Sequence, residues 1–152
     1  MPLVNYFLLA ISASLFLTFA HSQEVIIVDG DTIRVDGEKI RFTGIDAPEL
    51  RQTCVKKDEV LPCGEFSKTL LEDLIQDKKV SCVREGNDRY GRTLAECYIN
   101  EQSLSSFLVR SGYAFAYRQY SKKFIEDEEY AKINANGMWD TEFQFPWNFR
   151  KK

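Results

Sequence analysis

Short apolar stretches separated by Asp-Gly pairs constrain the first half of the chain most. Three segments either alternate apolar with polar side chains or are largely apolar: residues 24–28, 31–35 and 39–45. They are separated by Asp29-Gly30 and Asp36-Gly37. A period of two predicts half-buried strands, and Asp-Gly is typical of hairpin turns because both turn positions require positive φ. Three consecutive strands joined by two tight turns are therefore predicted.

After residue 63 the apolar period becomes that of a helix. The apolar face of a predicted helix over residues 64–76 consists of Phe66, Leu70, Leu71, Leu74 and Ile75. Further along, the pattern predicts strands at 79–84 and 93–99, a short helix at 103–111, an extended aromatic segment at 113–117 and a last helix at 124–136. This order predicts an α+β, β-rich domain: a five-stranded OB-type antiparallel barrel packed with about three helices.

The N-terminal segment predicts export. Residues 6–20 carry no charge, and only Ser and Thr interrupt their apolar character. The run is shorter than the ~20 apolar residues that span a bilayer and is typical of a secretory signal. An uncleaved anchor is the alternative, because the preceding residues lack Lys and Arg. We divide the chain into a signal peptide (1–22), one domain (23–145) and a C-terminal tail (146–152), and expect a secreted or periplasmic monomer.

Four cysteines follow the predicted signal, Cys54, Cys63, Cys82 and Cys97. An even number in an exported chain predicts disulfides. The midpoint between Cys82 and Cys97 falls in the polar loop between two predicted strands, so this pair can face across them. The pair Cys54–Cys63 would close the segment before the first helix. Free thiols, or a zinc ion held by all four thiolates, are the alternatives.

Several classes of catalyst are excluded. The single histidine, His21, lies at the predicted cleavage site, so the mature chain lacks the imidazole of Ser-His and Cys-His hydrolases. Neither Gly-x-x-x-x-Gly-Lys nor Gly-x-Gly-x-x-Gly occurs. The net charge of −3 argues against tight coating of nucleic acid, although it allows a local basic cleft. Catalysis would have to rest on carboxylates, cations, the backbone or a metal.

Carboxylates and arginines gather in three segments, DGDT at 29–32, RFTGIDAPE at 41–49 and DRYGR at 88–92. Asp31 and Asp46 are hard oxygen donors that suit Ca²⁺. Arg41 and Arg92 carry planar, forked donors that match the charge developing on phosphoryl oxygens. Glu49 could orient or activate an attacking water. Each residue alone is consistent with a turn, a solvated charge or a structural ion pair, but together they predict a site for cleaving phosphodiesters.

These segments, in this order and spacing, resemble the staphylococcal nuclease (thermonuclease) family. The resemblance continues through LVRSGYAFAY and GMWD and covers residues 25–142. It implies an OB-type barrel and a Ca²⁺-dependent endonuclease. The implied substrates are DNA and RNA, single-stranded or frayed by preference, and the implied products carry 3′-phosphates.

The resemblance also implies roles for individual residues. The positions that match the family's metal site are Asp31, Asp46 and Ala47, the last through its backbone carbonyl. The positions that match its catalytic residues are Arg41, Glu49 and Arg92. Tyr90, Tyr117 and Tyr120 are expected to contact nucleotides, because bases stack on aromatic rings. Packing at the core or its rim is the alternative role for these tyrosines.

The chain also departs from the family pattern. It is acidic and contains four cysteines, whereas the family's reference nuclease is basic and has no disulfides. The connection from residue 49 to the first predicted helix is rebuilt around Cys54 and Cys63, next to the predicted site. Two other functions therefore stay open: a catalytically inactive module that binds nucleic acid or protein, and an exported structural or inhibitor-like module stapled by disulfides.

Overall fold

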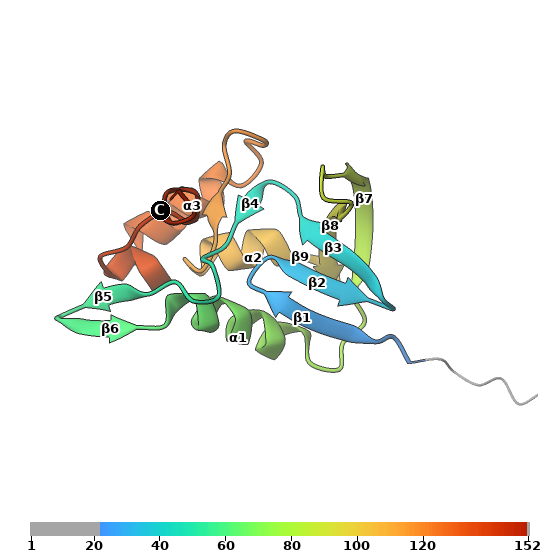
Figure 1. Cartoon of the computed structure of the whole chain (residues 1–152), viewed down its shortest axis with the longest axis horizontal. Coiled ribbons are helices and arrows are strands. Elements are labelled where there is room, and N and C mark those ends of the chain that lie inside the picture. The colour runs from blue at the N-terminus through green and yellow to red at the C-terminus, as the bar shows by residue number, and fades with distance from the viewer. Residues whose placement is uncertain (1–21, 152) are drawn as a thin grey trace, which may run out of the picture.

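The computed structural model describes residues 22–151 (Figure 1). The predicted signal segment, apart from Ser22, lies outside this range. The main sheet has the order β1 (Val25–Asp29), β2 (Thr32–Val35), β3 (Glu38–Phe42), β8 (Thr93–Ile99) and β7 (Ser81–Asn87), and β9 (Gln102–Ser103) pairs with β8. Two small sheets pair β4 (Ile45–Asp46) with β10 (Phe115–Ala116), and β5 (Cys54–Lys56) with β6 (Glu59–Leu61).

Helices flank the main sheet (Figure 1). They are α1 (Cys63–Ile75), α2 (Leu104–Arg110), α3 (Ile125–Ile133), the 3₁₀ helix η1 (Gly137–Asp140) and α4 (Pro146–Phe149). The mixed α+β class is confirmed. The short helix α4 begins the segment that the sequence analysis assigns to a tail, with Pro146 at its first position, where the missing N–H costs nothing. Within residues 22–151, no helix combines the length and apolar character needed to cross a membrane.

The sheet differs from the predicted barrel in two ways. Strand β3 pairs with β8 in parallel, with Ile40 opposite Thr93, so the expectation of a purely antiparallel sheet is wrong at this pair. The long connection through α1 and β7 permits it, since parallel neighbours need a crossover of a dozen or more residues. Among the described residues, the pairing runs from β1 to β7 without returning, so the strand pairing does not show a closed barrel.

The main core lies between this sheet and helices α1 and α2. Ile33, Ile40 and Phe42 point inward from β2 and β3 and are almost completely buried. Leu71 of α1 and Leu108 of α2 cover them, as the predicted helical faces require. This packing fixes the strands that carry the predicted site residues.

A second, smaller core is built from the C-terminal segment. Phe115 is fully buried, and rings from residues 139–147 surround it; those within 5.5 Å between centroids are Trp139, Phe143 and Phe145. The cluster also includes Cys54 and Cys63. It therefore ties the chain end to the segment that follows Glu49.

Both predicted disulfides are present, Cys54–Cys63 and Cys82–Cys97. Cys82 and Cys97 lie directly opposite each other in the β7–β8 pair. Cys54 and Cys63 connect the β5–β6 hairpin to the start of α1. With both pairs formed, no free cysteine remains among the described residues, and the zinc and free-thiol alternatives are excluded for them.

Candidate active site

The β1–β2 turn presents Asp31 toward the other site residues. The Asp29 carboxylate accepts a hydrogen bond from the Asp31 N–H at 3.1 Å, which holds the turn. Asp31 itself is only 3% exposed. One of its oxygens contacts Arg41 and also accepts the Thr32 hydroxyl at 3.2 Å, while the other accepts the Ala47 N–H at 2.6 Å. The turn therefore places a buried carboxylate beside β3 and β4.

The two Asp-Gly turns are not equivalent. Asp36 and Gly37 have φ values of 49° and 86°, the positive pair predicted for a tight hairpin. Gly30 does not have positive φ. It is needed for space instead, because a Cβ at this position would lie 2.0 Å from Ser67 Oγ on α1 and 2.9 Å from Ala47 Cβ.

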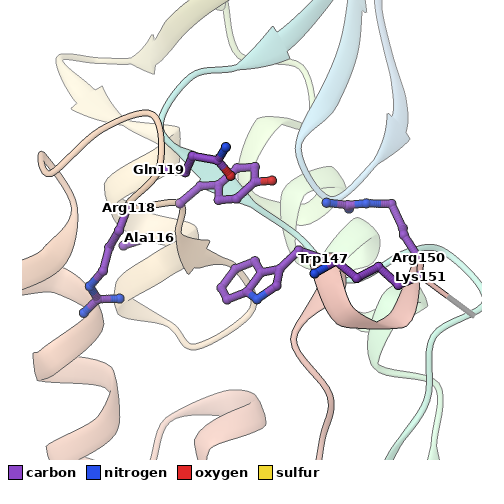
Figure 2. A pocket seen from close by; sticks show the side chains of 7 residues that line it. Ala116, Arg118, Gln119, Trp147, Arg150 and Lys151 are labelled. Carbon is purple, nitrogen blue, oxygen red and sulfur yellow. The ribbon is translucent and has the colours of Figure 1, made fainter.

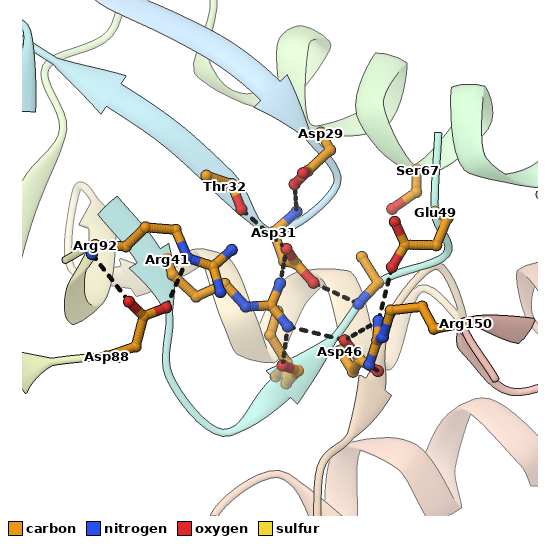
Figure 3. Close-up of polar contacts among 12 residues, drawn as sticks. Asp29, Asp31, Thr32, Arg41, Asp46, Glu49, Ser67, Asp88, Arg92 and Arg150 are labelled. Atoms are coloured by element: carbon orange, nitrogen blue, oxygen red, sulfur yellow. Dashed lines mark hydrogen bonds and ion pairs between the residues drawn. The ribbon is translucent and has the colours of Figure 1, made fainter. Parts of the chain in front are cut away.

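Arg41 joins the two predicted metal-binding aspartates (Figure 3). Its guanidinium contacts Asp31 through Nη1 and Asp46 Oδ1 through Nη2, the latter at 2.8 Å. Asp46 is fully buried. Burial lowers the pKa of the Arg41 guanidinium below its ordinary value, although Asp46 opposes this effect. Two carboxylates thus converge on one guanidinium.

Glu49 is held by the rebuilt connection. Gln52 is almost fully buried, and its side-chain oxygen accepts the Glu49 N–H at 3.2 Å, while its amide nitrogen donates to the Gln144 carbonyl at 2.6 Å. On the other side, a Cβ at Gly64 would lie 1.9 Å from the Glu49 carbonyl oxygen. The turn that carries Glu49 is therefore packed directly on the start of α1.

Arg150 is part of the cluster, although the sequence analysis did not include it. Its Nη1 lies 2.7 Å from Glu49 Oε1 and 3.1 Å from Asp46 Oδ1, and its Nη2 lies 2.8 Å from Asp46 Oδ2. Burial alone would lower the pKa of Arg150, but the hydrogen bonds to Asp46 and Glu49 outweigh it and raise that pKa above its ordinary value. A local signal is present in the sequence: aromatic residues alternate over positions 143–149, and three cations follow at 150–152.

Arg92 lies to one side of the cluster (Figure 3). Its Nε is 2.7 Å from Asp88 Oδ2, and the other Asp88 oxygen accepts the N–H groups of Tyr90 and Arg92 at 2.9 Å. Burial tends to raise the pKa of Asp88, but these hydrogen bonds outweigh it and hold the pKa below its usual value. The positive charge of Arg92 also lowers the pKa of Arg41. The two predicted phosphate-binding arginines therefore lie close enough to interact electrostatically.

Two of the three predicted tyrosines line cavities, and the third packs against one of them. Tyr90 is 69% exposed and lines a cavity of about 310 Å³ with Arg92. Tyr117 lines a cavity of about 450 Å³ with Trp147 and Arg150 (Figure 2). Tyr120, which is exposed, packs edge-on against Tyr117 at 4.9 Å between ring centroids. Each cavity thus includes one arginine of the cluster.

The donor chemistry of the cluster fits a hard divalent cation. Among residues 22–151, no three His, Cys, Asp or Glu side chains are arranged to hold a metal, and the oxygens of Asp31 and Asp46 contact guanidinium groups and a backbone N–H instead. The charge around Asp31 and Asp46 nevertheless favours a cation. The carboxylates of Asp31, Asp46 and Glu49 face only two guanidinium groups, which leaves a net negative charge at a largely buried oxygen-lined site.

Comparison with known proteins identifies the family. Residues 39–141 match the family model described as staphylococcal nuclease homologue. The chain is 37% identical over 122 residues to a Haemophilus influenzae protein named uncharacterized endonuclease, covering 76% of this chain and 64% of that protein.

Two further relatives cover more of their own length. An Escherichia coli O157:H7 protein, also named uncharacterized endonuclease, is 32% identical over 142 residues, covering 87% of this chain and 86% of that protein. A Shigella flexneri protein named micrococcal nuclease is 32% identical over 145 residues, covering 84% and 78%. With the matched segment spanning most of the folded domain, the chain belongs to the staphylococcal nuclease family.

Proposed function

We propose that this protein is a Ca²⁺-dependent endonuclease that hydrolyses DNA and RNA to 3′-phosphate products in an oxidising compartment outside the cytosol. The observation that carries the proposal is the convergence of Asp31 and Asp46 on Arg41, with Glu49 tied to Asp46 through Arg150. The family membership and the endonuclease names of its relatives support it. The two disulfides support the compartment.

Each residue has a distinct part in the proposed hydrolysis. Ca²⁺, held by Asp31, Asp46 and the Ala47 carbonyl, would supply positive charge that stabilises the phosphodiester as its negative charge grows. Arg41 and Arg92 donate to the non-bridging oxygens. Glu49 orients a water and accepts its proton. The water oxygen bonds to phosphorus, the bond to the 5′-oxygen breaks, and that oxygen takes a proton from solvent and leaves as a 5′-hydroxyl.

The substrate is proposed to run past both cavities. Tyr90, Tyr117 and Tyr120 offer aromatic surface, which suits unpaired bases because stacking does not depend on sequence. Single-stranded or frayed nucleic acid is therefore the expected substrate. We also propose that the strands of the main sheet form the OB-type barrel that the sequence predicts.

The test is nuclease activity with and without calcium. We expect the mature protein to degrade single-stranded DNA and RNA in Ca²⁺ and to stop in chelator, and Glu49→Gln to lower kcat by about 10²–10⁴-fold, as for loss of a general base. Glu59→Gln, an exposed change on β6, is the matched control and should keep the full rate.

Three results would contradict this proposal in different ways. Equal degradation in chelator would reject the calcium requirement. An unchanged kcat in Glu49→Gln would reject its role with water. Binding of nucleic acid without cleavage in any condition would identify a non-catalytic module.

A further inference from the structure

The C-terminal segment places the guanidinium of Arg150 against the active-site carboxylates. Arg150 directly follows α4, and its guanidinium forks between Asp46, at 2.8 and 3.1 Å, and Glu49, at 2.7 Å. The aromatic cluster holds α4 in place: the Trp147 ring stacks on Phe145 at 4.6 Å and on Tyr117 at 5.5 Å between centroids. The contact therefore depends on tertiary packing rather than on local sequence.

This guanidinium and a metal ion would compete for the same oxygens. Both oxygens of Asp46 contact Arg150, and Oδ1 also contacts Arg41. A carboxylate oxygen that is bonded to two guanidinium groups has little acceptor capacity left for a divalent cation. Oδ2 accepts from Arg150 alone, and a divalent cation at this oxygen would lie beside the positive charge of that guanidinium, so release of Asp46 by Arg150 favours metal binding.

Arg150 is the arginine that can move. The Arg41 side chain is only 14% exposed and comes from the middle of the sheet. The Arg150 side chain is 39% exposed, follows a helix of four residues, and lines the open cavity of about 450 Å³ (Figure 2). Glu49, its other partner, is itself 40% exposed at the side chain, so Arg150 can keep this contact while it leaves Asp46.

We propose that Arg150 is an exchangeable counter-ion of the active site: it holds Asp46 and Glu49 in the metal-free protein, and it yields Asp46 but keeps Glu49 when a divalent cation binds. This inference rests on the proposed calcium dependence. Arg150 is then a positioning residue, because it acts on the reaction through the carboxylate of Glu49. It opposes metal binding and orients Glu49 once the metal is bound.

Calorimetric titration with Ca²⁺ tests the competition directly. Arg150→Gln removes the guanidinium charge, so no ion pair with Asp46 has to be broken when Ca²⁺ binds. We expect the variant to bind Ca²⁺ about tenfold more tightly, which corresponds to the usual strength of one charge-assisted hydrogen bond. Lys151→Gln is the matched control, since it removes the same charge from the next, exposed residue. It should leave the affinity within about twofold, because exposed charges are screened.

Thermal unfolding separates this role from a merely structural one. In chelator, Arg150→Gln should unfold several degrees below the wild type, because Asp46 and Glu49 lose a shared counter-ion. In saturating Ca²⁺ most of the difference should disappear, because only the half-exposed contact with Glu49 is then lost. Arg150→Lys keeps the positive charge without the two-armed guanidinium, so in chelator its unfolding temperature should lie between those of the wild type and Arg150→Gln. An equal deficit in both conditions would overturn the inference.

Nuclease activity at saturating Ca²⁺ tests whether Arg150 orients the Glu49 carboxylate. Arg150→Gln should lower kcat by about tenfold because Glu49 is less well oriented, and the same change should cost nothing further in a Glu49→Gln background. An additive loss would overturn the positioning role.

The outcomes distinguish this inference from the proposed function. If the wild type binds Ca²⁺ and Arg150→Gln binds it no more tightly than Lys151→Gln does, the inference alone is wrong. If the wild type binds no Ca²⁺, both the inference and the calcium mechanism are wrong.

Discussion

At the scale of single residues, Asp46 has the most demanding environment. It is fully buried, and its charge is balanced by Arg41 and Arg150. A buried carboxylate is tolerated only when it is paired and hydrogen-bonded. Arg41 meets this need and also reaches Asp31 with the other arm of the same guanidinium, which a point charge on a flexible stem cannot reproduce.

We therefore expect Arg41→Lys to be damaging although it conserves charge. Stability should fall by about 2 kcal/mol and the cleavage rate by at least about 100-fold, because one ammonium cannot join both carboxylates and match phosphate oxygens. Urea unfolding and initial rates on single-stranded DNA measure the two effects. Arg34→Lys, on the exposed side of β2, is the control. A wild-type cleavage rate in Arg41→Lys would show that the two-armed guanidinium is not required.

At the scale of elements, the repeated Val-Asp-Gly motif serves two purposes. At Asp36-Gly37 it forms the tight turn itself, through positive φ. At Asp29-Gly30 the aspartate holds the Asp31 backbone, and the glycine allows the hairpin to approach Ser67 and Ala47. The second Asp-Gly turn thus needs its glycine for positive φ, and the first needs its glycine because a side chain would not fit against α1.

This difference predicts that two alanine substitutions both destabilise the protein but that only the one at Gly30 lowers the activity of the folded fraction. Gly30→Ala should destabilise the protein by about 2 kcal/mol and also lower the activity of the folded fraction, because the new methyl group pushes Asp31 away from α1. Gly37→Ala meets no atom within 4 Å, so it should cost only about 1–2 kcal/mol of conformational strain. Full specific activity in folded Gly30→Ala would contradict the packing argument.

At the scale of the whole molecule, ion pairs join distant parts of the chain. Glu96 on β8 is 3% exposed, accepts the Ser103 hydroxyl at 2.8 Å, and pairs with Lys123 in the connection before α3. Burial tends to raise the pKa of Glu96, but the hydrogen bonds from Lys123 and Ser103 outweigh it and hold the pKa below its ordinary value. Asp88, beside Arg92, also has a lowered pKa.

Stability should therefore fall in acid. A carboxylate with a lowered folded-state pKa adds stability that is present above its unfolded pKa and is lost as the pH falls through the folded value. We expect the urea midpoint to be nearly constant from about pH 7 to about pH 5 and to decline below about pH 4.5. Lys123→Met should make the decline shallower. An equally steep decline in that variant would show that other groups dominate.

The sequence by itself determined those features that depend on neighbours a few residues away. Alternation located the strands of the main sheet except β9, the helical period located α1, and the spacing of Cys82 and Cys97 matched their register across β7 and β8. The short strands β5 and β6 were not predicted. The order of the acidic and arginine motifs matched the cluster of Asp31, Asp46 and Arg41, because all three belong to adjoining strands or turns.

Only the tertiary structure decided what depends on packing between distant segments. Arg150 reaches Asp46 across 104 residues of chain because aromatic rings dock α4 on Phe115, and hydrophobic packing is non-directional, so no local pattern encodes the partner. The parallel β3–β8 pair and the spatial role of Gly30 have the same origin. Short-range periodicity specifies elements, whereas the close fit of side chains between them decides which charges meet.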